Sequence, residues 1–328
     1  MSGQLELIQG LLLAFALVVI LMPPFIRLLH YAGFGKQIRD VEPEAHMAKW
    51  GTPTLGGLLV IIVVLGVFLA LKWPPQGGVI APIATLALVG LLGAVDDYLN
   101  AKTGEGIRAR QKLLWQTVVA LFVAYQIQST YEITAIRVPF VGDVAISPVV
   151  YIFFGAFAIV AASNGVNITD GLDGLAGGTL ALAFVSFMII ALLNVPAQPQ
   201  IAFLCALLIG ALLGFLWFNV HPAQIIMGDA GSLSLGATLA VIALITGQIL
   251  VLPLIGLIFV LETGSVILQV AYFKLTKGRR IFRMSPLHYH FELGGWDEEK
   301  ITLRFWIVGI LAGLLGVTLF LSSINALV

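Results

Sequence analysis

Residues 201–218 read IAFLCALLIGALLGFLWF, a run of eighteen residues without a single charge. A bilayer core about 30 Å thick is crossed by roughly 20 apolar residues in helical form. The run therefore predicts a membrane-spanning helix. It also contains Cys205, the only cysteine of the chain, which excludes a disulfide framework or a cysteine metal cluster.

The whole chain shares the character of this stretch. Of its 328 residues, 59% are hydrophobic and only 10% are charged, whereas a soluble domain carries about 25% charged residues. A water-soluble fold of this composition would expose apolar surface over most of its exterior. Composition therefore excludes an ordinary cytosolic enzyme, a nucleic-acid-binding protein and a disordered chain, and it indicates an integral membrane protein.

We expect an all-α membrane protein of about ten transmembrane helices that form a single domain over residues 1–328. The expected spans are Leu5–Leu29, Thr54–Leu71, Val79–Val95, Leu113–Ile127, Val149–Ala162, Leu175–Leu193, Ile201–Phe218, Leu233–Ile249, Leu252–Tyr272 and Thr302–Ile324. The ninth span contains Glu262, Gly264 and Gln269, so we expect a bend or break there. Between the fourth and fifth spans, Tyr131–Ser147 predicts a small hairpin outside the membrane with a Gly-Asp turn.

Basic residues are distributed unevenly among the loops. The loops after odd-numbered spans hold 15 of the 17 Lys and Arg residues, and the other loops hold only Lys72 and Arg137. Basic loops face the cytoplasm in most membrane proteins. We therefore expect the loops after odd-numbered spans in the cytoplasm, with both termini and the hairpin outside.

Asp96 and Asp97 are expected at the end of the third span, in the run AVDDYLN at 94–100. Adjacent helical residues point about 100° apart, so two such carboxylates cannot easily grip one ion from a regular helix. We therefore expect Asp96 and Asp97 to have different roles. A solvated helix end, or pairing with Lys102 or Lys112, is the alternative.

A second polar segment, NGVNITDGLDGLA, occupies residues 164–176. Asn164 and Asn167 are three residues apart, as are Asp170 and Asp173, and the glycines between them allow a ligand to approach the backbone. The segment leads into the sixth span, whose N-terminal amides would favour an anion. A plain turn with an Asp cap would explain only one of these groups.

A third polar segment, MGDAGS at 227–232, places Asp229 just before the eighth span. Mg²⁺ is usually bound by a few carboxylates together with substrate phosphates. Asp229 is therefore a candidate Mg²⁺ ligand, and a helix cap is the alternative.

The segment SPLHYHFE at 285–292 follows a basic run. In an extended loop His288 and His290 would point the same way. The neighbouring cations favour phosphate contact or acid–base work over a transition-metal site, for which the spacing offers no third ligand. An ordinary surface loop is the alternative.

The segment HMAKWGTPTLGG at 46–57 precedes the second span. Its Lys49 and Thr54 lie beside glycines and a proline. They either contact a phosphate or simply begin the helix.

All five polar segments belong to the loops assigned to the cytoplasm. Acidic residues can bind a metal ion, the metal ion can neutralise phosphate, and basic residues can pair with the remaining negative charge. These are the groups that enzymes of phosphoryl transfer use. Because the groups lie at a membrane surface, we expect at least one substrate to be a lipid.

These motifs resemble the polyprenyl-phosphate N-acetylhexosamine-1-phosphate transferase superfamily, and within it the family of phospho-N-acetylmuramoyl-pentapeptide transferases. The motifs that carry the resemblance are TPTLGG at 52–57, DD at 96–97, NITDGLDGLA at 167–176, MGDAGS at 227–232 and PLHYHFE at 286–292. They occur in the family's order and spacing and cover essentially the whole chain.

The resemblance implies ten transmembrane helices, a homodimer in the bacterial inner membrane, and an active site that faces the cytoplasm. It implies Mg²⁺ as cofactor. The implied reaction transfers phospho-N-acetylmuramoyl-pentapeptide from UDP-MurNAc-pentapeptide to undecaprenyl phosphate in the lipid bilayer. The products would be UMP and lipid I, a precursor of peptidoglycan.

The resemblance also implies roles for individual residues. Asp229 matches the family's metal ligand, and Asp96 and Asp97 match the pair tied to activation of the lipid phosphate. His288 is expected to act in catalysis beside the sugar. The expected substrate contacts are Lys49, Thr54, Lys112, Asn167, Asp170, Asp173, Gln269, Tyr289 and His290.

Two positions depart from the family pattern. The family usually has three consecutive histidines, and here the middle position is Tyr289. It also tends to have Lys four residues after the first Asp of the pair, where this chain has Asn100. Lys102 or Arg108 could supply the missing charge.

Several alternatives stay open at the level of sequence. The lipid phosphate either attacks directly, with its proton removed or oriented by Asp96 or Asp97, or an Asp forms a covalent intermediate. A sister transferase moving N-acetylglucosamine-1-phosphate would use the same inventory, although the PLHYHFE loop favours the muramoyl enzyme. The polar ninth span also suits a secondary transporter, but only Glu262 is expected near mid-membrane.

Overall fold

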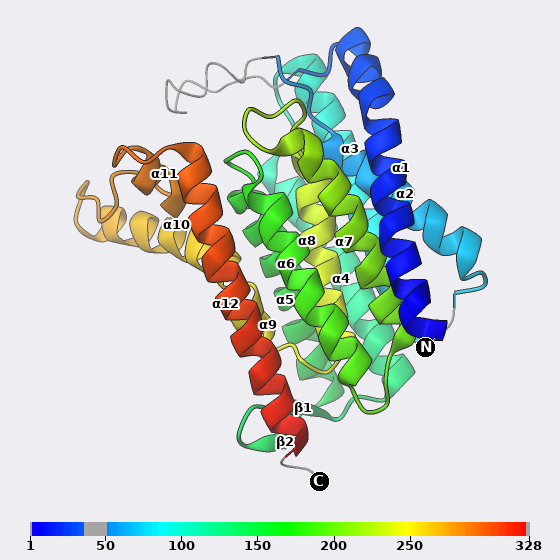
Figure 1. Ribbon diagram of the computed structural model, residues 1–328. Helices are drawn as coiled ribbons and strands as arrows, with labels where there is room; N and C mark the ends of the chain where they lie inside the picture. The colour runs from blue at the N-terminus through cyan, green and yellow to red at the C-terminus, as the bar shows by residue number, and fades with distance from the viewer. Residues whose placement is uncertain (1, 36–50, 76, 326–328) are drawn as a thin grey trace.

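The computed structural model of the chain describes residues 2–35, 51–75 and 77–325 (Figure 1). These residues form long helices and one two-stranded antiparallel hairpin. The helices are α1 (Ser2–Ala32), α2 (Gly56–Leu71), the 3₁₀ turn η2 (Gly77–Val79), α3 (Ile80–Thr103), α4 (Ala109–Tyr131), α5 (Pro148–Thr169), α6 (Leu175–Leu193), α7 (Pro199–Asn219), α8 (Gly228–Ile245), α9 (Leu252–Ile255), α10 (Leu257–Leu275), α11 (Leu287–Glu292) and α12 (Glu298–Asn325). The strands are β1 (Ala135–Val138) and β2 (Gly142–Ala145).

Each of the ten predicted spans is helical, which confirms an all-α membrane protein. Among the described residues, eight helices are long and apolar enough to cross a membrane by themselves. The other two spans are α2, which is shorter, and α4, which begins with the polar residues Arg110, Gln111 and Lys112.

Helix α8 is the centre of the bundle. It packs mainly against α3 and α5, while α7 packs against α1 and α6. Every residue of α8 from Ala230 to Ile245 is buried. Helix contact in a membrane relies on small residues that let backbones approach. At Gly93 of α3, an added Cβ would lie only 2.3 Å from the carbonyl oxygen of Asp229.

The ninth span is broken, but not at the polar residues where the break was expected. The break lies at Gly256, between the short α9 and α10. Glu262, Gly264 and Gln269 instead belong to one continuous helix, so the expected position was wrong. The polar side chains leave the helix intact because Glu262 and Gln269 find hydrogen-bond partners on α11 and on the loop before it. Figure 1 shows α10 and α11 standing away from the bundle.

The predicted hairpin is present, with Ala135 paired to Ala145 and Val138 to Gly142. Its turn comprises residues 139–141, one step before the expected Gly-Asp pair, because Gly142 and Asp143 already belong to β2. Arg137 and Asp143 face each other across the two strands.

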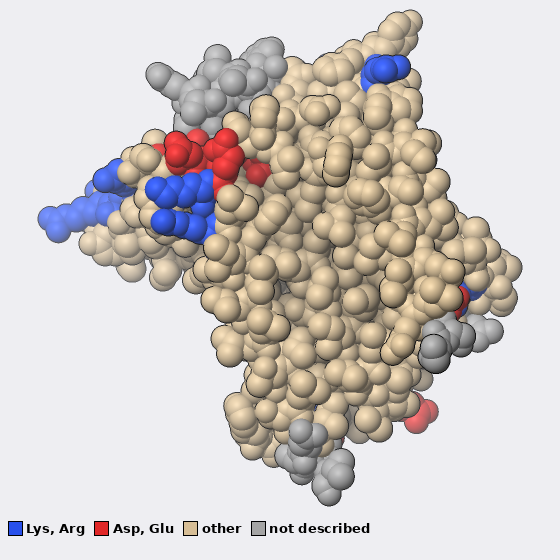
Figure 2. Space-filling view, in the orientation of Figure 1, with Lys and Arg blue, Asp and Glu red and all other residues tan. Residues whose placement is uncertain are grey.

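The charged groups lie mostly at one end of the bundle. In Figure 1 the hairpin, the beginning of α1 and the end of α12 lie in the lower half of the view, and α11 lies toward the upper end. Figure 2 shows basic and acidic side chains gathered on the projecting part of the upper end, above a largely uncharged surface. Lys72 at the lower end is paired with Glu6.

Candidate active site

Asp97 of α3 holds the beginning of α8. Its two carboxylate oxygens accept hydrogen bonds from the backbone N–H groups of Asp229 and Ala230, each at 3.0 Å. The first N–H groups of a helix have no partner within that helix, and α8 has no side-chain cap of its own. Asp97 therefore supplies the missing acceptors from a neighbouring helix and positions Asp229.

Asp96 and Asp229 share the ammonium group of Lys112. The Lys112 Nζ lies 2.9 Å from Asp96 Oδ2 and also contacts Asp229 Oδ2. The other oxygen of Asp96 accepts from the backbone N–H of Ile107 at 2.5 Å. Residues from three segments thus meet at one point, as the motif analysis predicted.

Asn167 joins this group from α5. Its side-chain nitrogen donates to Asp229 Oδ1 at 2.7 Å and to Ser232 Oγ at 2.9 Å. The sequence analysis expected Asn167 in a loop, but α5 continues to Thr169 and places it on a helix. We refer to Asp96, Asp97, Lys112, Asn167 and Asp229 as the acidic centre.

The charges of the acidic centre do not balance when all are ionised. Three carboxylates face one ammonium group, and Asp96 and Asp97 are only 6% and 5% exposed. Partly buried like charges require a cation or a proton. Carboxylate oxygens are ligands that suit Mg²⁺. The carboxylates of the acidic centre therefore suit the cation expected at Asp229, and its binding stays a prediction.

The TPTLGG segment supports the same site through its backbone. Gly56 and Gly57 donate N–H bonds to the carbonyls of Ile226 and Met227 at 2.9 Å, and Ile226 donates to Pro53 at 2.8 Å. This ladder fixes the turn that ends at Gly228. An added Cβ on Gly228 would lie 2.7 Å from the Thr54 hydroxyl, so Thr54 borders the acidic centre.

His288 lies in a second, fully buried cluster. Its Nδ1 is 3.0 Å from Glu262 Oε2, and its backbone N–H donates to Glu262 Oε1 at 3.2 Å. Both side chains are 0% exposed. A Cβ on Gly171 would lie 2.3 Å from His288 Nε2, so the glycine of the NITDGLDG segment is what lets the imidazole approach that turn.

The loop that contains the histidines is not extended. Residues 287–292 form α11, so His288 and His290 do not point the same way as predicted. His290 Nδ1 accepts from the backbone N–H of Arg283 at 3.1 Å. Gln269 accepts from the N–H groups of Ile281 and Phe282 and donates to the Phe282 carbonyl, each at 3.0 Å. Gln269 thus fastens the loop before α11.

Asp173 belongs to a third cluster, at the beginning of α6. Its Oδ2 lies 3.0 Å from His221 Nδ1 and accepts from the Ala223 N–H at 3.1 Å. Its backbone N–H donates to Glu298 of α12 at 2.5 Å. The cluster ties α6, α7 and α12 together.

Comparison with known proteins adds independent evidence. The family described as Glycosyl transferase family 4 matches residues 79–247. A phospho-N-acetylmuramoyl-pentapeptide-transferase of Desulfosudis oleivorans is 44% identical, over 95% of this chain and 91% of the relative. The transferase of the same name from Listeria innocua is 42% identical, over 95% of this chain and 97% of the relative.

The chain belongs to the phospho-N-acetylmuramoyl-pentapeptide-transferase family. It is therefore an enzyme, a phosphoglycosyl transferase of the membrane. The resemblance inferred from the five motifs is confirmed.

The transferase brings together many, though not all, of the predicted site residues. Six residues meet at or beside the acidic centre: Thr54, Asp96, Asp97, Lys112, Asn167 and Asp229. Asp170 lies on the turn after α5, and Tyr289 makes an edge contact with His288. Lys49 lies outside the described residues. The substrate contacts of all these residues stay predictions.

Two residues in these clusters were missed by the sequence analysis as site residues. Glu262 was expected near mid-membrane, but it is the partner of His288. A lone acid in an apolar span usually has a task, so this signal was available. His221 carried no comparable signal, because its link to Asp173 depends on how α6 and α7 meet.

Proposed function

We propose that this transferase moves phospho-N-acetylmuramoyl-pentapeptide from UDP-MurNAc-pentapeptide to undecaprenyl phosphate, giving lipid I and UMP for peptidoglycan synthesis. The names of the relatives support this substrate pair. The observation that carries the proposal is the acidic centre, because three carboxylates and one ammonium from three helices suit a diphosphate with a divalent cation.

The proposed setting is the bacterial inner membrane, with the acidic centre facing the cytoplasm, both termini outside and two chains forming a homodimer. The distribution of basic residues in the sequence supports this orientation, because 15 of the 17 belong to the segments that follow odd-numbered spans, and Lys112 of the acidic centre is one of them. A water-soluble nucleotide substrate would then reach the site from the cytoplasm.

The proposed reaction is a direct displacement. An oxygen of the lipid phosphate forms a bond to the β-phosphorus of the UDP-sugar. The bond from that phosphorus to the bridging oxygen breaks, and UMP leaves with the electron pair. Any proton on the attacking phosphate passes to a carboxylate.

Asp96 is the better candidate for that carboxylate. Both oxygens of Asp97 already accept backbone N–H bonds at the beginning of α8, which makes Asp97 a positioning residue. Asp96 instead contacts the ammonium group of Lys112, and the flexible stem of a lysine allows that group to turn from the carboxylates to an incoming phosphate.

Mg²⁺ is part of the proposal, with Asp229 as its protein ligand. When bound, it would neutralise negative charge on the diphosphate. Asn167 keeps Asp229 oriented through Oδ1, and Lys112 would be available to pair with substrate phosphate.

The decisive test is UMP release by the purified protein in detergent with undecaprenyl phosphate. UDP-MurNAc-pentapeptide and UDP-N-acetylglucosamine are compared, each with Mg²⁺ and with chelator. We expect Mg²⁺-dependent release with the muramoyl substrate alone. Release with UDP-N-acetylglucosamine alone would assign the chain to the sister activity instead.

A rapid-quench experiment distinguishes the two mechanisms. The protein is mixed with UDP-sugar labelled in the β-phosphate, without lipid. Direct displacement predicts neither labelled protein nor UMP release. Labelled protein together with a stoichiometric burst of UMP would establish a covalent intermediate and overturn the direct mechanism.

A further inference from the structure

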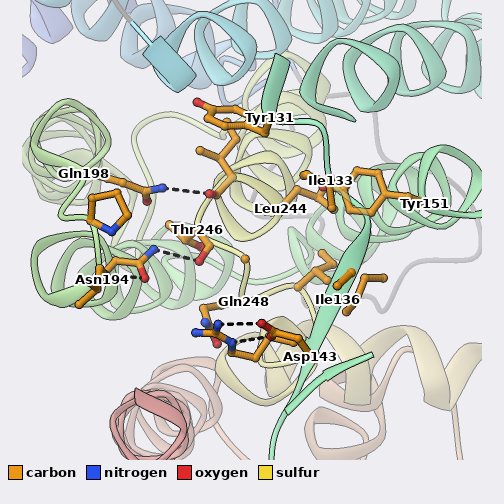
Figure 3. Close-up of a pocket in the computed structure, with 17 residues that line it drawn as sticks. Tyr131, Ile133, Ile136, Asp143, Tyr151, Asn194, Gln198, Leu244, Thr246 and Gln248 are labelled. Carbon is orange, nitrogen blue, oxygen red and sulfur yellow. Dashed lines mark hydrogen bonds and ion pairs between the residues drawn. The ribbon is translucent and has the colours of Figure 1, made fainter. Parts of the chain in front are cut away.

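A cavity of about 290 Å³, shown in close-up in Figure 3, lies at the end of the bundle that bears the hairpin, opposite the acidic centre. It is enclosed by the hairpin, the end of α4, the α6–α7 loop and the α8–α9 loop. Its size is near the lower limit of ligand sites, which are typically about 300–1,000 Å³. The reaction proposed for the acidic centre does not involve this cavity.

Polar groups on the cavity wall are left without partners among the described residues. Tyr151 is 2% exposed, and its hydroxyl has no hydrogen-bond partner. The Gln198 side-chain oxygen is also buried without a partner, although its nitrogen donates to the Ile245 carbonyl at 3.0 Å. Buried polar atoms are normally satisfied, so both groups are suited to a polar ligand.

One side of the cavity carries an ion pair of zero net charge. Arg137 donates to both oxygens of Asp143, at 2.9 and 3.2 Å. This contact holds the pKa of Asp143 below its usual range, so both charges are present at neutral pH. Figure 3 shows Asp143 beside Gln248, across the cavity from Tyr131. A zwitterion with its own phosphate and ammonium would complement the pair.

Two further openings adjoin the cavity at Tyr131. The first opening, of about 320 Å³, is as large as the main cavity, and the second, of about 160 Å³, is smaller; Tyr131 lines both openings and the main cavity. The second opening runs between α3 and α4, where Ile80 and Phe122 are 55% and 54% exposed. In a membrane-spanning bundle these exposed apolar side chains face acyl chains.

We propose that this cavity binds the headgroup of a zwitterionic phospholipid with a primary ammonium, such as phosphatidylethanolamine. The phosphate pairs with Arg137 and the ammonium with Asp143, while Tyr151 and Gln198 hydrogen-bond the headgroup. One acyl chain lies in the groove between α3 and α4. The site is independent of the acidic centre, so the proposed reaction does not bear on it.

The test measures lipid retention by native mass spectrometry of the purified protein. The delipidated protein is offered phosphatidylethanolamine, phosphatidylcholine and phosphatidylglycerol with identical acyl chains. We expect phosphatidylethanolamine to be retained about tenfold better than either of the others, as one charge-assisted contact is worth about that factor. Equal retention, or preference for the anionic lipid, would overturn the proposal.

Variants tie the retention to this cavity. Tyr151→Phe, and the double change Arg137→Gln with Asp143→Asn, should each lower phosphatidylethanolamine retention about tenfold. Tyr125→Phe on the lipid-facing side of α4 and Lys72→Gln at the same end of the bundle are the matched controls. Tyr151→Phe preserves the hairpin, so its result counts even when the double variant folds poorly. Retention equal to the unchanged protein in both variants would refute the site.

Discussion

The close approach of α3 to α8 makes Gly93 a sensitive probe of the acidic centre. In a Gly93→Ala variant the new Cβ would lie 2.3 Å from the Asp229 carbonyl oxygen and 2.4 Å from its carbonyl carbon. Ordinary contact begins at 3.4 Å, so the helices must separate by about 1 Å. The neighbouring atoms are backbone and cannot rotate away.

This displacement occurs at Asp229, the proposed metal ligand. A misplacement of about 1 Å at a catalytic group costs about 100-fold in rate, whereas overpacking costs about 1–3 kcal/mol of stability. We therefore expect UMP release by Gly93→Ala to fall about 100-fold, with the protein still folded in a thermal-melting assay.

Gly90 provides the matched control, one turn earlier on α3. A Cβ there would meet the end of the flexible Ile61 side chain, 2.8 Å away at Cδ1, and that side chain can move. Gly90→Ala should therefore retain most of the activity. A Gly93→Ala variant as active as Gly90→Ala would refute the idea that this helix contact positions Asp229.

Three other predictions concern single side chains, each measured as UMP release with thermal melting as the folding control. Asp229→Asn should abolish turnover in a folded protein, and retained Mg²⁺-dependent turnover would contradict its role as metal ligand. Glu262→Gln keeps the size of the side chain but removes the charge beside His288, so we expect kcat to fall about tenfold; an unchanged kcat would make the pair merely structural. His288→Ala should lower turnover strongly, whereas Tyr289→His should be tolerated, and an inactive Tyr289→His variant would give the tyrosine a specific task.

The helical spans could be predicted from sequence because each depends on a local property. A run such as 201–218 must be helical in a bilayer, since lipid offers no partner for backbone N–H and C=O groups. Helix ends were predicted less well. Asn167 and Asp97 lie within helices that continue past the expected boundaries, because polar residues at a bundle end can be satisfied by neighbouring helices.

The membership of the acidic centre was also predictable, although its internal contacts were not. Five separated motifs with acids and amides pointed to one site, and Asp96, Asp229 and Asn167 do meet. The sequence analysis assigned Asp97 to the lipid phosphate, but its oxygens serve the amides that begin α8. This role of Asp97 depends on the packing of α3 against α8, because the carboxylate lies on α3 and the N–H groups that it accepts from lie on α8.

By itself, the amino-acid sequence determined the membrane setting, the helical spans and the family, because hydropathy and motif order are properties of the chain alone. The tertiary structure decided which groups touch. In it Glu262 contacts His288, and Lys112 pairs with both Asp96 and Asp229. It also forms a cavity at the hairpin end of the bundle. Such contacts join residues far apart in the chain, and their distances depend on how closely glycine and other small residues allow the helices to pack.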